Sequence, residues 1–206
     1  MSENRYGLTE EEVKVLKILN SPRKIQDFLN SLKINFEEKG DTCLSPRRVL
    51  REKQCHCIEG AMLAALALHF HNQKPLIVDL DTNRSDFAHV IAVFKENNKW
   101  GAISKTNHAV LRFREPVYNS IRELVMSYFH EYTNDSGEKT LRSYSLPVNV
   151  LRFGTNWITS EEDVWEVPEY LVKVKHFKII DNNQIPKLRR ADDLEIQAGQ
   201  LVEWRK

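Results

Sequence analysis

Apolar residues recur every three or four positions through the first third of the chain, a pattern that predicts amphipathic helices. The first stripe consists of Leu8, Val15, Ile18 and Leu19, with Leu16 at its edge. Thr9 and Glu12 form a capping box in front of this stripe, so a helix is expected to begin there. A Ser-Pro pair at 21–22 supplies a cap and a first-turn proline for a second helix, whose stripe falls within 25–32.

Two further helices are expected before the pattern changes. A second Ser-Pro pair, at 45–46, opens a short helix that should stop near Gln54. A longer helix is predicted from about Cys57 to His69, and its alanines suit close packing in the middle of a domain.

From Pro75 onward the apolar residues follow strand-like runs rather than helical stripes. Three strands are predicted at 76–80, 89–94 and 100–104, with a polar hairpin turn at 95–99. Later segments are predicted as a helix at 121–132, an extended stretch at 144–153, a helix start at 159–163 and a strand at 170–180.

Helices followed by strands predict an α+β fold with an antiparallel sheet. The 206 residues suit one domain, 1–206, with a helical part over about 8–70 and a sheet-containing part over about 75–206. A net charge of +1 gives no bulk attraction to nucleic acid or to an anionic membrane, and no apolar stretch approaches the roughly 20 residues that span a bilayer.

The compartment is inferred from the first residues and from the cysteines. The beginning of the sequence lacks the basic start and apolar core of a secretion signal, and an odd number of cysteines, three, does not make a disulfide framework. We therefore expect a cytoplasmic protein with reduced thiols. The sequence leaves its oligomeric state open.

The sharpest chemical signal is a cysteine at a predicted helix start. Cys57 stands shortly before the apolar run 62–68, where unpaired backbone N–H groups and the helix dipole favour a thiolate. Further along the chain, His89 stands at the start of an apolar strand. A cysteine and a histidine in such positions are the two parts of a thiol-nucleophile site, provided that the fold brings them together.

The order of these parts resembles the transglutaminase-like superfamily, whose core is papain-like. Cys57-Ile58-Glu59-Gly60-Ala61 matches the family's cysteine with a small residue four positions later. The run 89–94 matches its histidine strand, and 100–104 matches the strand after the hairpin. The resemblance covers roughly residues 45 to 107. It implies that Cys57 is a nucleophile and His89 its proton carrier, in an enzyme that transfers or hydrolyses the acyl group of an amide or ester and needs no cofactor.

One position departs from the family. The family usually carries an aspartate on the next strand to orient the histidine, and this chain has Ser104 there. Asn107, three residues further on, and Asp86, three residues before the histidine, are the candidates for that role. Gln54 is a candidate oxyanion donor beside the backbone N–H of the nucleophile. The expected substrate is a peptide or protein amide, with water or an amine resolving the thioester.

Two other interpretations compete with an enzyme. Ser104 at the aspartate position is also compatible with an inactive member of the fold that binds a peptide or protein. A metal or redox sensor would use Cys55 and Cys57, and a zinc site would draw its ligands from the group Cys55, His56, Cys57, His69 and His71. In that group each pair is separated by one residue, whereas zinc sites usually use Cys-x2–4-Cys and His-x3–5-His, so no metal is expected.

Interleaved arginines form the other conspicuous cluster. It consists of Arg112 and Arg114 with Arg122, Lys139 and Arg142. These cations could bind a carboxylate or phosphate of a substrate. Nearby glutamates, among them Glu131 and Glu138, favour the alternative that they form ion pairs on a solvated face.

Overall fold

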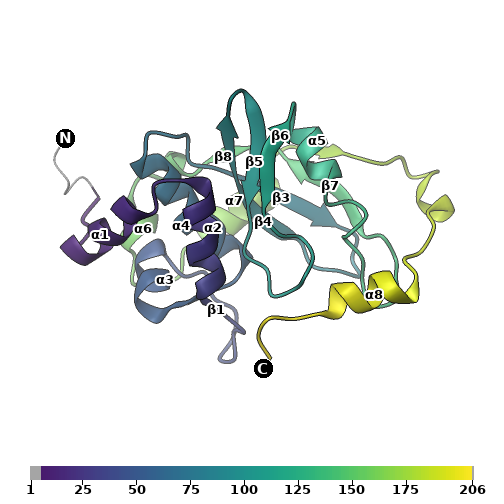
Figure 1. Ribbon diagram of the computed structural model, residues 1–206, viewed down its shortest axis with the longest axis horizontal. Coiled ribbons are helices and arrows are strands. Elements are labelled where there is room, and N and C mark those ends of the chain that lie inside the picture. Colours follow the sequence, from purple (N-terminus) through teal and green to yellow (C-terminus); the bar gives the residue numbers. More distant parts are fainter. Residues whose placement is uncertain (1–5, 206) are drawn as a thin grey trace.

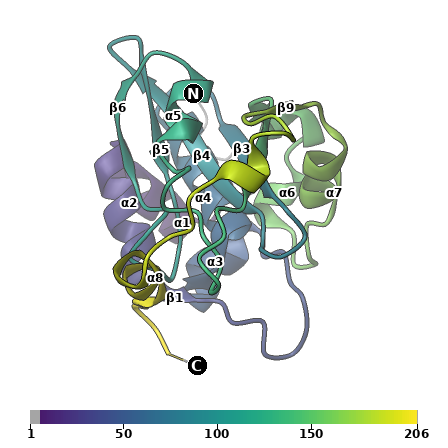
Figure 2. The same cartoon turned by 90° about the vertical axis from the view of Figure 1, so that its right-hand side faces the viewer.

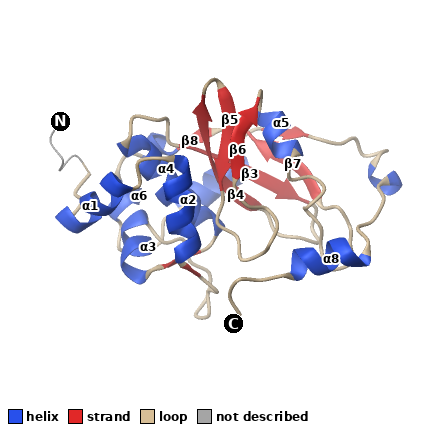
Figure 3. Cartoon of the chain, in the orientation of Figure 1, coloured by secondary structure: helices blue, strands red, loops and turns tan. Residues whose placement is uncertain are grey.

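The computed structural model describes residues 6–205 and shows a mixed α+β fold with an antiparallel sheet, as the sequence predicts. The helices of the first third of the chain gather on one side of the molecule, strands cross its middle, and the C-terminal helix lies on the other side (Figure 1, Figure 3). The α-helices are α1 (Glu10–Ile18), α2 (Pro22–Ser31), α3 (Pro46–Glu52), α4 (Cys57–Phe70), α5 (Ile121–Met126), α6 (Asn156–Thr159), α7 (Glu166–Lys173) and α8 (Asp193–Gln200). Two 3-10 turns are η1 (Val150–Phe153) and η2 (Ile185–Lys187).

The main sheet has the strand order β6-β5-β4-β3-β7-β9, and β8 also pairs with β3. Its strands are β3 (Leu76–Thr82), β4 (His89–Glu96), β5 (Lys99–Ile103), β6 (Arg114–Tyr118), β7 (Leu141–Ser145), β8 (Val148–Asn149) and β9 (His176–Lys178). Every pairing in it is antiparallel. Asn97 and Asn98 form the turn of the β4–β5 hairpin, both with positive φ, as its tight geometry requires.

The sheet separates two apolar clusters, because side chains alternate between its faces. On one face, Ile77 and Ala92 pack in the cluster that contains α4, and on the other face Val78 and Ile91 pack with α5. The first cluster also draws residues from α1, α2, α3, α6 and α7. Viewed from the side, α2 and α7 lie to either side of α4 (Figure 2). Helix α4 is therefore the centre of the helical layer.

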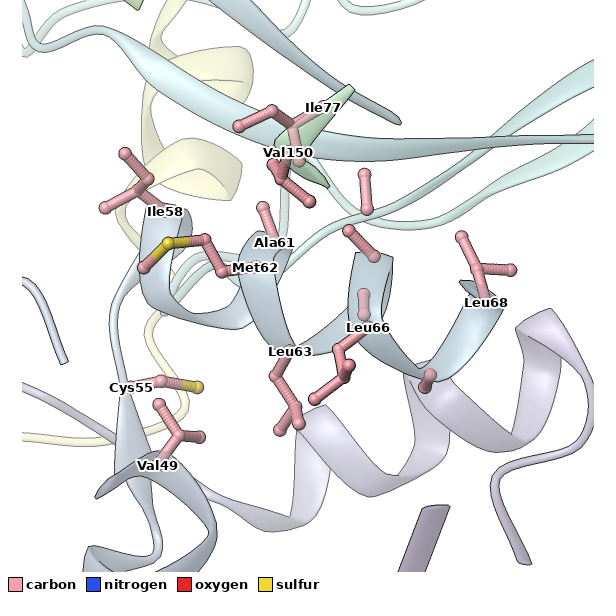
Figure 4. Packing of buried hydrophobic residues seen from close by; sticks show 14 of the residues in the cluster. Val49, Cys55, Ile58, Ala61, Met62, Leu63, Leu66, Leu68, Ile77 and Val150 are labelled. Atoms are coloured by element: carbon pink, nitrogen blue, oxygen red, sulfur yellow. The ribbon is translucent and has the colours of Figure 1, made fainter. Parts of the chain in front are cut away.

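Burial on all sides distinguishes α4 from the other helices. Every residue from Ile58 to Leu68 is buried. Figure 4 shows Ile77 and Val150 on one side of this helix, and Val49 and Cys55 on the other. A helix that is apolar all round belongs in a core, and the small alanines allow its neighbours to approach closely. The predicted span, Cys57 to about His69, agrees with the observed one to within a residue.

The beginning of α4 is held by a short parallel pair of strands. Here β1 (Lys33–Ile34) pairs with β2 (Gln54–Cys55), with Ile34 opposite Cys55. Lys53, which ends α3, has a left-handed backbone conformation that turns the chain into β2. The residues just before α4 are thus fixed by backbone hydrogen bonds rather than left as a free loop.

The predicted N-terminal helices are present, with one error in the first stripe. Thr9 and Glu12 make the expected capping box of α1. Leu16 is fully buried, whereas Ile18, which was assigned to the stripe, is 66% exposed. Helix α1 ends at Ile18, and its buried residues are Glu12, Val13 and Leu16.

The C-terminal half departs further from the sequence pattern. Helix α5 stops at Met126 and gives way to turns, and the stretch predicted as extended over 144–153 ends in η1. The helix expected to start at 159–163 begins instead at Glu166. The strand predicted over 170–180 is wrong for its first part, because 170–173 belong to α7. Val167 and Leu171, four positions apart, are its buried residues, and this helical spacing outweighs the local alternation.

Candidate functional site

Cys57 is the first residue of α4, and its position follows from the residues around it. The carboxylate of Glu59 accepts a hydrogen bond from the backbone N–H of His56 at 2.8 Å, which closes the first turn of the helix. Gly60 allows the segment after β5 to approach, since a Cβ on Gly60 would lie 2.7 Å from Cβ of Lys105. The absence of a side chain at Gly60 thus lets the helix start lie directly against the end of β5.

His89 is the first residue of β4 and lies opposite Leu80 of β3, with 7% of its surface exposed. The imidazoles of His89 and of His56 both flank the thiol of Cys57 as hydrogen-bonding partners. The fold therefore brings the predicted cysteine and histidine together. It also adds a second histidine that the sequence analysis considered only as a metal ligand.

Ser104 fixes the tautomer of His89. Its Oγ lies 2.8 Å from Nε2 of His89, and its own hydroxyl donates to the carbonyl of Leu111 at 2.5 Å. Because the hydroxyl proton is used on Leu111, Oγ accepts at the imidazole, and Nε2 of His89 must carry the proton. This leaves Nδ1 as the basic nitrogen for Cys57.

Gln26 of α2 holds Ser104 in place. Its side-chain oxygen accepts from the backbone N–H of Ser104 at 2.9 Å, and its Nε2 donates to the carbonyl of Ser104 at 2.8 Å. Gln26 is itself buried and bonded to Asn30 at 2.8 Å. A buried amide that satisfies both backbone groups of one residue fixes that residue firmly.

The electrostatics of the site favour a thiolate. Burial alone would raise the pKa of Cys57, but the hydrogen bonds from His56 and His89 outweigh it and lower the pKa to about 5. The other two cysteines behave differently: burial raises the pKa of Cys55 to about 12 and also raises that of Cys43. All three are free thiols, and only Cys57 combines a lowered pKa with partial exposure.

A cavity of about 540 Å³ opens beside Cys57 and His89. Its apolar wall includes Ile34, Phe36, Phe87, Leu111, Tyr132 and Ile196. Phe87 stands at the rim with 89% of its surface exposed. The C-terminal segment contributes to the wall through Ile196 of α8, so residues far apart in the chain enclose the thiol together.

Asn107, predicted to orient His89, does something else. Its Nδ2 donates to the carbonyl of Trp204 at 2.9 Å, and its Oδ1 accepts from the N–H of Trp204 at 2.8 Å. Its backbone carbonyl also accepts from Glu203 at 2.8 Å. The proposed contact with His89 is therefore wrong, because the amide is engaged with the C-terminal segment. Ser104 itself occupies the orienting position.

Asp86, the second orienting candidate, is also directed elsewhere. Its Oδ2 accepts from Thr140 at 2.5 Å, and its Oδ1 accepts from the backbone N–H of Phe87 at 2.8 Å. It lies in the connection between β3 and β4, where the chain turns before the strand begins. Spacing by three residues therefore does not bring it to the imidazole of His89.

Gln54, the candidate oxyanion donor, lies in β2 and lines a neighbouring hollow rather than the cavity beside Cys57. The strand alternation buries Cys55 and sends Gln54 to the opposite side. The backbone N–H of Cys57 has no acceptor within α4, since it belongs to the first turn. Of the two donors suggested from the sequence, this N–H is the one that the fold leaves at the thiol.

Arginines of the interleaved cluster form local ion pairs. Arg114 contacts Glu131 at 2.6 Å, and Arg142 contacts Glu138 at 3.2 Å, as the ion-pair alternative expects. Among residues 6–205, no group of three or more His, Cys, Asp and Glu side chains is arranged to hold a metal ion. In the same described range, none of the helices has both the length and the apolar character needed to cross a bilayer.

Comparison with protein-family models finds none that matches this chain, and comparison with curated proteins finds no match either. What can be said of function therefore comes from the site. The site consists of a partly exposed thiol of lowered pKa with an imidazole of fixed tautomer beside it, and it opens on a largely apolar cavity.

Proposed function

We propose that this protein is a thiol-dependent enzyme of the transglutaminase-like kind, which transfers or hydrolyses the acyl group of a peptide or protein amide, or of an ester. One observation supports this most directly: Cys57, at a helix start and with a lowered pKa, adjoins His89, whose Nε2 is held by Ser104. A nucleophile, a base and a group that orients the base are the parts that covalent acyl transfer requires.

In the first half of the reaction, the thiolate of Cys57 attacks the substrate carbonyl carbon. In this scheme the backbone N–H of Cys57 donates to the negative charge that develops on the carbonyl oxygen. As the tetrahedral intermediate collapses, the bond to the leaving amine or alcohol breaks. Nδ1 of His89 gives its proton to that leaving group, and a thioester on Cys57 remains.

In the second half, water or a primary amine attacks the thioester. Nδ1 of His89 takes one proton from the attacking group, and the carbon–sulfur bond breaks to restore the thiolate of Cys57. Water gives a carboxylic acid, and an amine gives a new amide. No cofactor enters either step in this proposal.

The contact of Ser104 with His89 favours the enzyme over an inactive binding module. The departure from the family's aspartate was the main support for the inactive alternative. A serine hydroxyl that accepts from Nε2 still orients the ring, although it adds no negative charge. The apolar wall of the cavity favours a substrate with an apolar side chain next to the reacting carbonyl. Three free cysteines are typical of a protein in a reducing compartment, and we propose the cytoplasm.

Trapping the acyl-enzyme tests the proposal. The protein is mixed with 4-nitrophenyl acetate, or with dimethylcasein and a fluorescent primary amine, and acyl adducts are located by mass spectrometry. We expect an adduct on Cys57 that is absent in Cys57→Ala and strongly reduced in His89→Ala. The exposed His130 provides a matched control, since His130→Ala removes an imidazole away from the site. Acetylation spread over other residues, unaffected by either site variant, would refute the proposal.

A further inference from the structure

His56 is surrounded by acceptors on one side of its ring. Its Nε2 lies 3.1 Å from the carbonyl oxygen of Thr42, 3.3 Å from Oε1 of Glu59 and 3.6 Å from Oε1 of Glu37. A nitrogen that faces only acceptors must carry a proton. The other ring nitrogen, Nδ1, is then left for the adjacent thiol of Cys57, which His56 contacts.

Glu59 supplies a buried negative charge behind His56. Its side chain is completely buried and accepts hydrogen bonds from the backbone of His56 and of Leu44, both at 2.8 Å. Thr42 and Asn35 donate to the same carboxylate at 3.0 Å and 3.2 Å. Burial alone would raise the pKa of Glu59, but contact with His56 and the backbone donors outweigh burial and lower it. The group is therefore a carboxylate at neutral pH.

The two histidines that flank Cys57 have different charge partners. His89 has the neutral hydroxyl of Ser104 on its far side, whereas His56 has the carboxylate of Glu59. A carboxylate stabilises an imidazolium much more than a hydroxyl does. The negative charge that the family places behind the strand histidine is, in this chain, behind the histidine next to the nucleophile.

We infer that His56, held as an imidazolium by Glu59, is the residue that keeps Cys57 in the thiolate form, while His89 carries the proton that moves during the reaction. This inference rests on the proposed function and divides its acid–base work between two residues. Because His56 touches the reacting sulfur, it is a catalytic residue in this scheme, and Glu59 is a positioning residue.

Charge and protons balance in this scheme. The scheme requires a starting state with two negative groups, Glu59 and Cys57, and two positive groups, His56 and a His89 that carries a proton on both ring nitrogens. Acylation consumes the thiolate and moves the His89 proton to the leaving group, so Glu59 and His56 remain as a neutral pair. Deacylation returns one proton to His89 and releases the thiolate. The proton on His56 stays in place throughout.

The surrounding ionisable groups agree with a charged His56. Burial alone would lower its pKa, but the hydrogen bonds to Cys57 and Glu59 outweigh burial and raise the pKa to about 11. Glu37 adds a third negative group at its ring. Burial is the main cause that raises the pKa values of Asp79 and Tyr132, and the negative charge of Cys57 raises both further. Protonating His56 therefore offsets a locally negative environment.

The pH dependence of Cys57 alkylation tests this assignment without requiring turnover. Iodoacetamide labelling of Cys57 is followed by mass spectrometry from pH 4.5 to 9 in the parent, His56→Gln, His89→Ala and the control His130→Ala. Glutamine at 56 can still donate to Glu59 but carries no charge. We expect His56→Gln to slow labelling at pH 6 by at least about tenfold, because the thiolate fraction falls as the thiol pKa rises toward its ordinary value of about 8.5. His89→Ala should slow labelling at pH 6 less than His56→Gln does, because the imidazolium of His56 still faces the thiolate.

The opposite ranking would overturn the inference. If His89→Ala abolishes rapid labelling at pH 6 while His56→Gln leaves it within twofold of the parent, the ion pair belongs to His89 alone. Equal rates in all variants would overturn it as well. Folding of each variant is checked by circular dichroism and thermal unfolding.

A second measurement keeps the test valid if His56→Gln does not fold. In parent protein with 15N-labelled histidine, the ring nitrogens of His56 should show an imidazolium at pH 8, and a neutral ring at that pH would refute the assignment.

This inference can fail separately from the proposed function. If an acyl-enzyme forms and His56 has no effect on the thiolate, the proposed function stands and this inference fails. If the thiolate depends on His56 but no acyl adduct forms, the proposed function fails and the ion pair stands.

Discussion

The hydroxyl of Ser104 lies 2.8 Å from Nε2 of His89 and directs its own proton to the carbonyl of Leu111, so that it can only accept from the imidazole. A single hydroxyl in this way specifies which nitrogen of His89 faces Cys57. The consequence is that the identity of the residue at 104 matters for the tautomer of the histidine more than for its charge.

Replacing Ser104 with alanine should slow acyl transfer while leaving the thiol activated. The substitution leaves Nε2 of His89 without its acceptor, so the ring loses its fixed orientation. We expect acyl-enzyme formation to fall by roughly 10- to 100-fold, measured as the rate of 4-nitrophenolate release. Rapid iodoacetamide labelling of Cys57 at pH 6 should persist, because His56 is unchanged. Ser136→Ala, at an exposed turn, serves as the control.

Alkylation of Cys57 should have an acidic midpoint. Iodoacetamide reacts with the thiolate, and hydrogen bonds from two imidazoles, which outweigh burial, lower the pKa of Cys57 to about 5. The labelling rate should therefore rise as the pH passes through about 5 and change little between pH 6 and pH 8. Cys43 and Cys55, buried and of raised pKa, provide internal controls that should label only after unfolding. Equal labelling of all three in the folded protein would contradict the description of the site.

The positions of Cys57 and His89 were predictable from sequence because both belong to regular elements with strong patterns. The helix start at Cys57 and the strand start at His89 follow from apolar runs that the structure reproduces. The third group was not predictable in the same way. Ser104, Asn107 and Asp86 all lie at or beyond the ends of strands, where side-chain direction depends on loop geometry that no periodicity encodes.

His56 was overlooked as a partner of the thiol although the sequence carried a hint. A glutamate three positions after the helix cap is a capping signal, and Glu59 stands three positions after His56. What the sequence could not indicate is that Glu59 is wholly buried. Its burial depends on the segment that contains Asn35, Thr42 and Leu44, which folds over the helix start from a distant part of the chain.

Alanine at position 60 should destabilise the protein and disturb the site. A Cβ on Gly60 would lie 2.7 Å from Cβ of Lys105, so α4 or the segment after β5 must shift. We expect a loss of about 1–3 kcal/mol in the free energy of unfolding, typical of overpacking in a core. Thermal or urea unfolding measures it. Gly199→Ala is a matched control within a helix, because no atom lies within 4 Å of its added Cβ, and it should leave stability unchanged or slightly raised. Equal effects of the two substitutions would contradict the close approach at Gly60.

Alanine at position 107 should loosen the C-terminal segment and open the cavity. Asn107 makes both side-chain hydrogen bonds to Trp204, while α8 contains no buried residue that would hold the segment by apolar packing. We expect faster proteolytic cleavage within 193–205 and faster labelling of Cys57 by a bulky maleimide, with little change for small iodoacetamide. Asn182→Ala, at an exposed position, is the control. Unchanged proteolysis would show that other contacts retain the segment.

Helix α2 contains none of the residues proposed to react, yet it holds the two consecutive residues that follow β5. Gln26 binds both backbone groups of Ser104, and the ammonium of Lys105 donates to the carbonyls of Leu29 and Leu32 at the end of the same helix. Ser104 and Lys105 therefore cannot shift independently of α2. The orientation of the His89 ring therefore depends, through its contact with Ser104, on the position of α2 relative to the sheet. Substitutions beneath α2 lie far from the thiol. They should nevertheless change the orientation of the His89 ring and slow the proposed reaction.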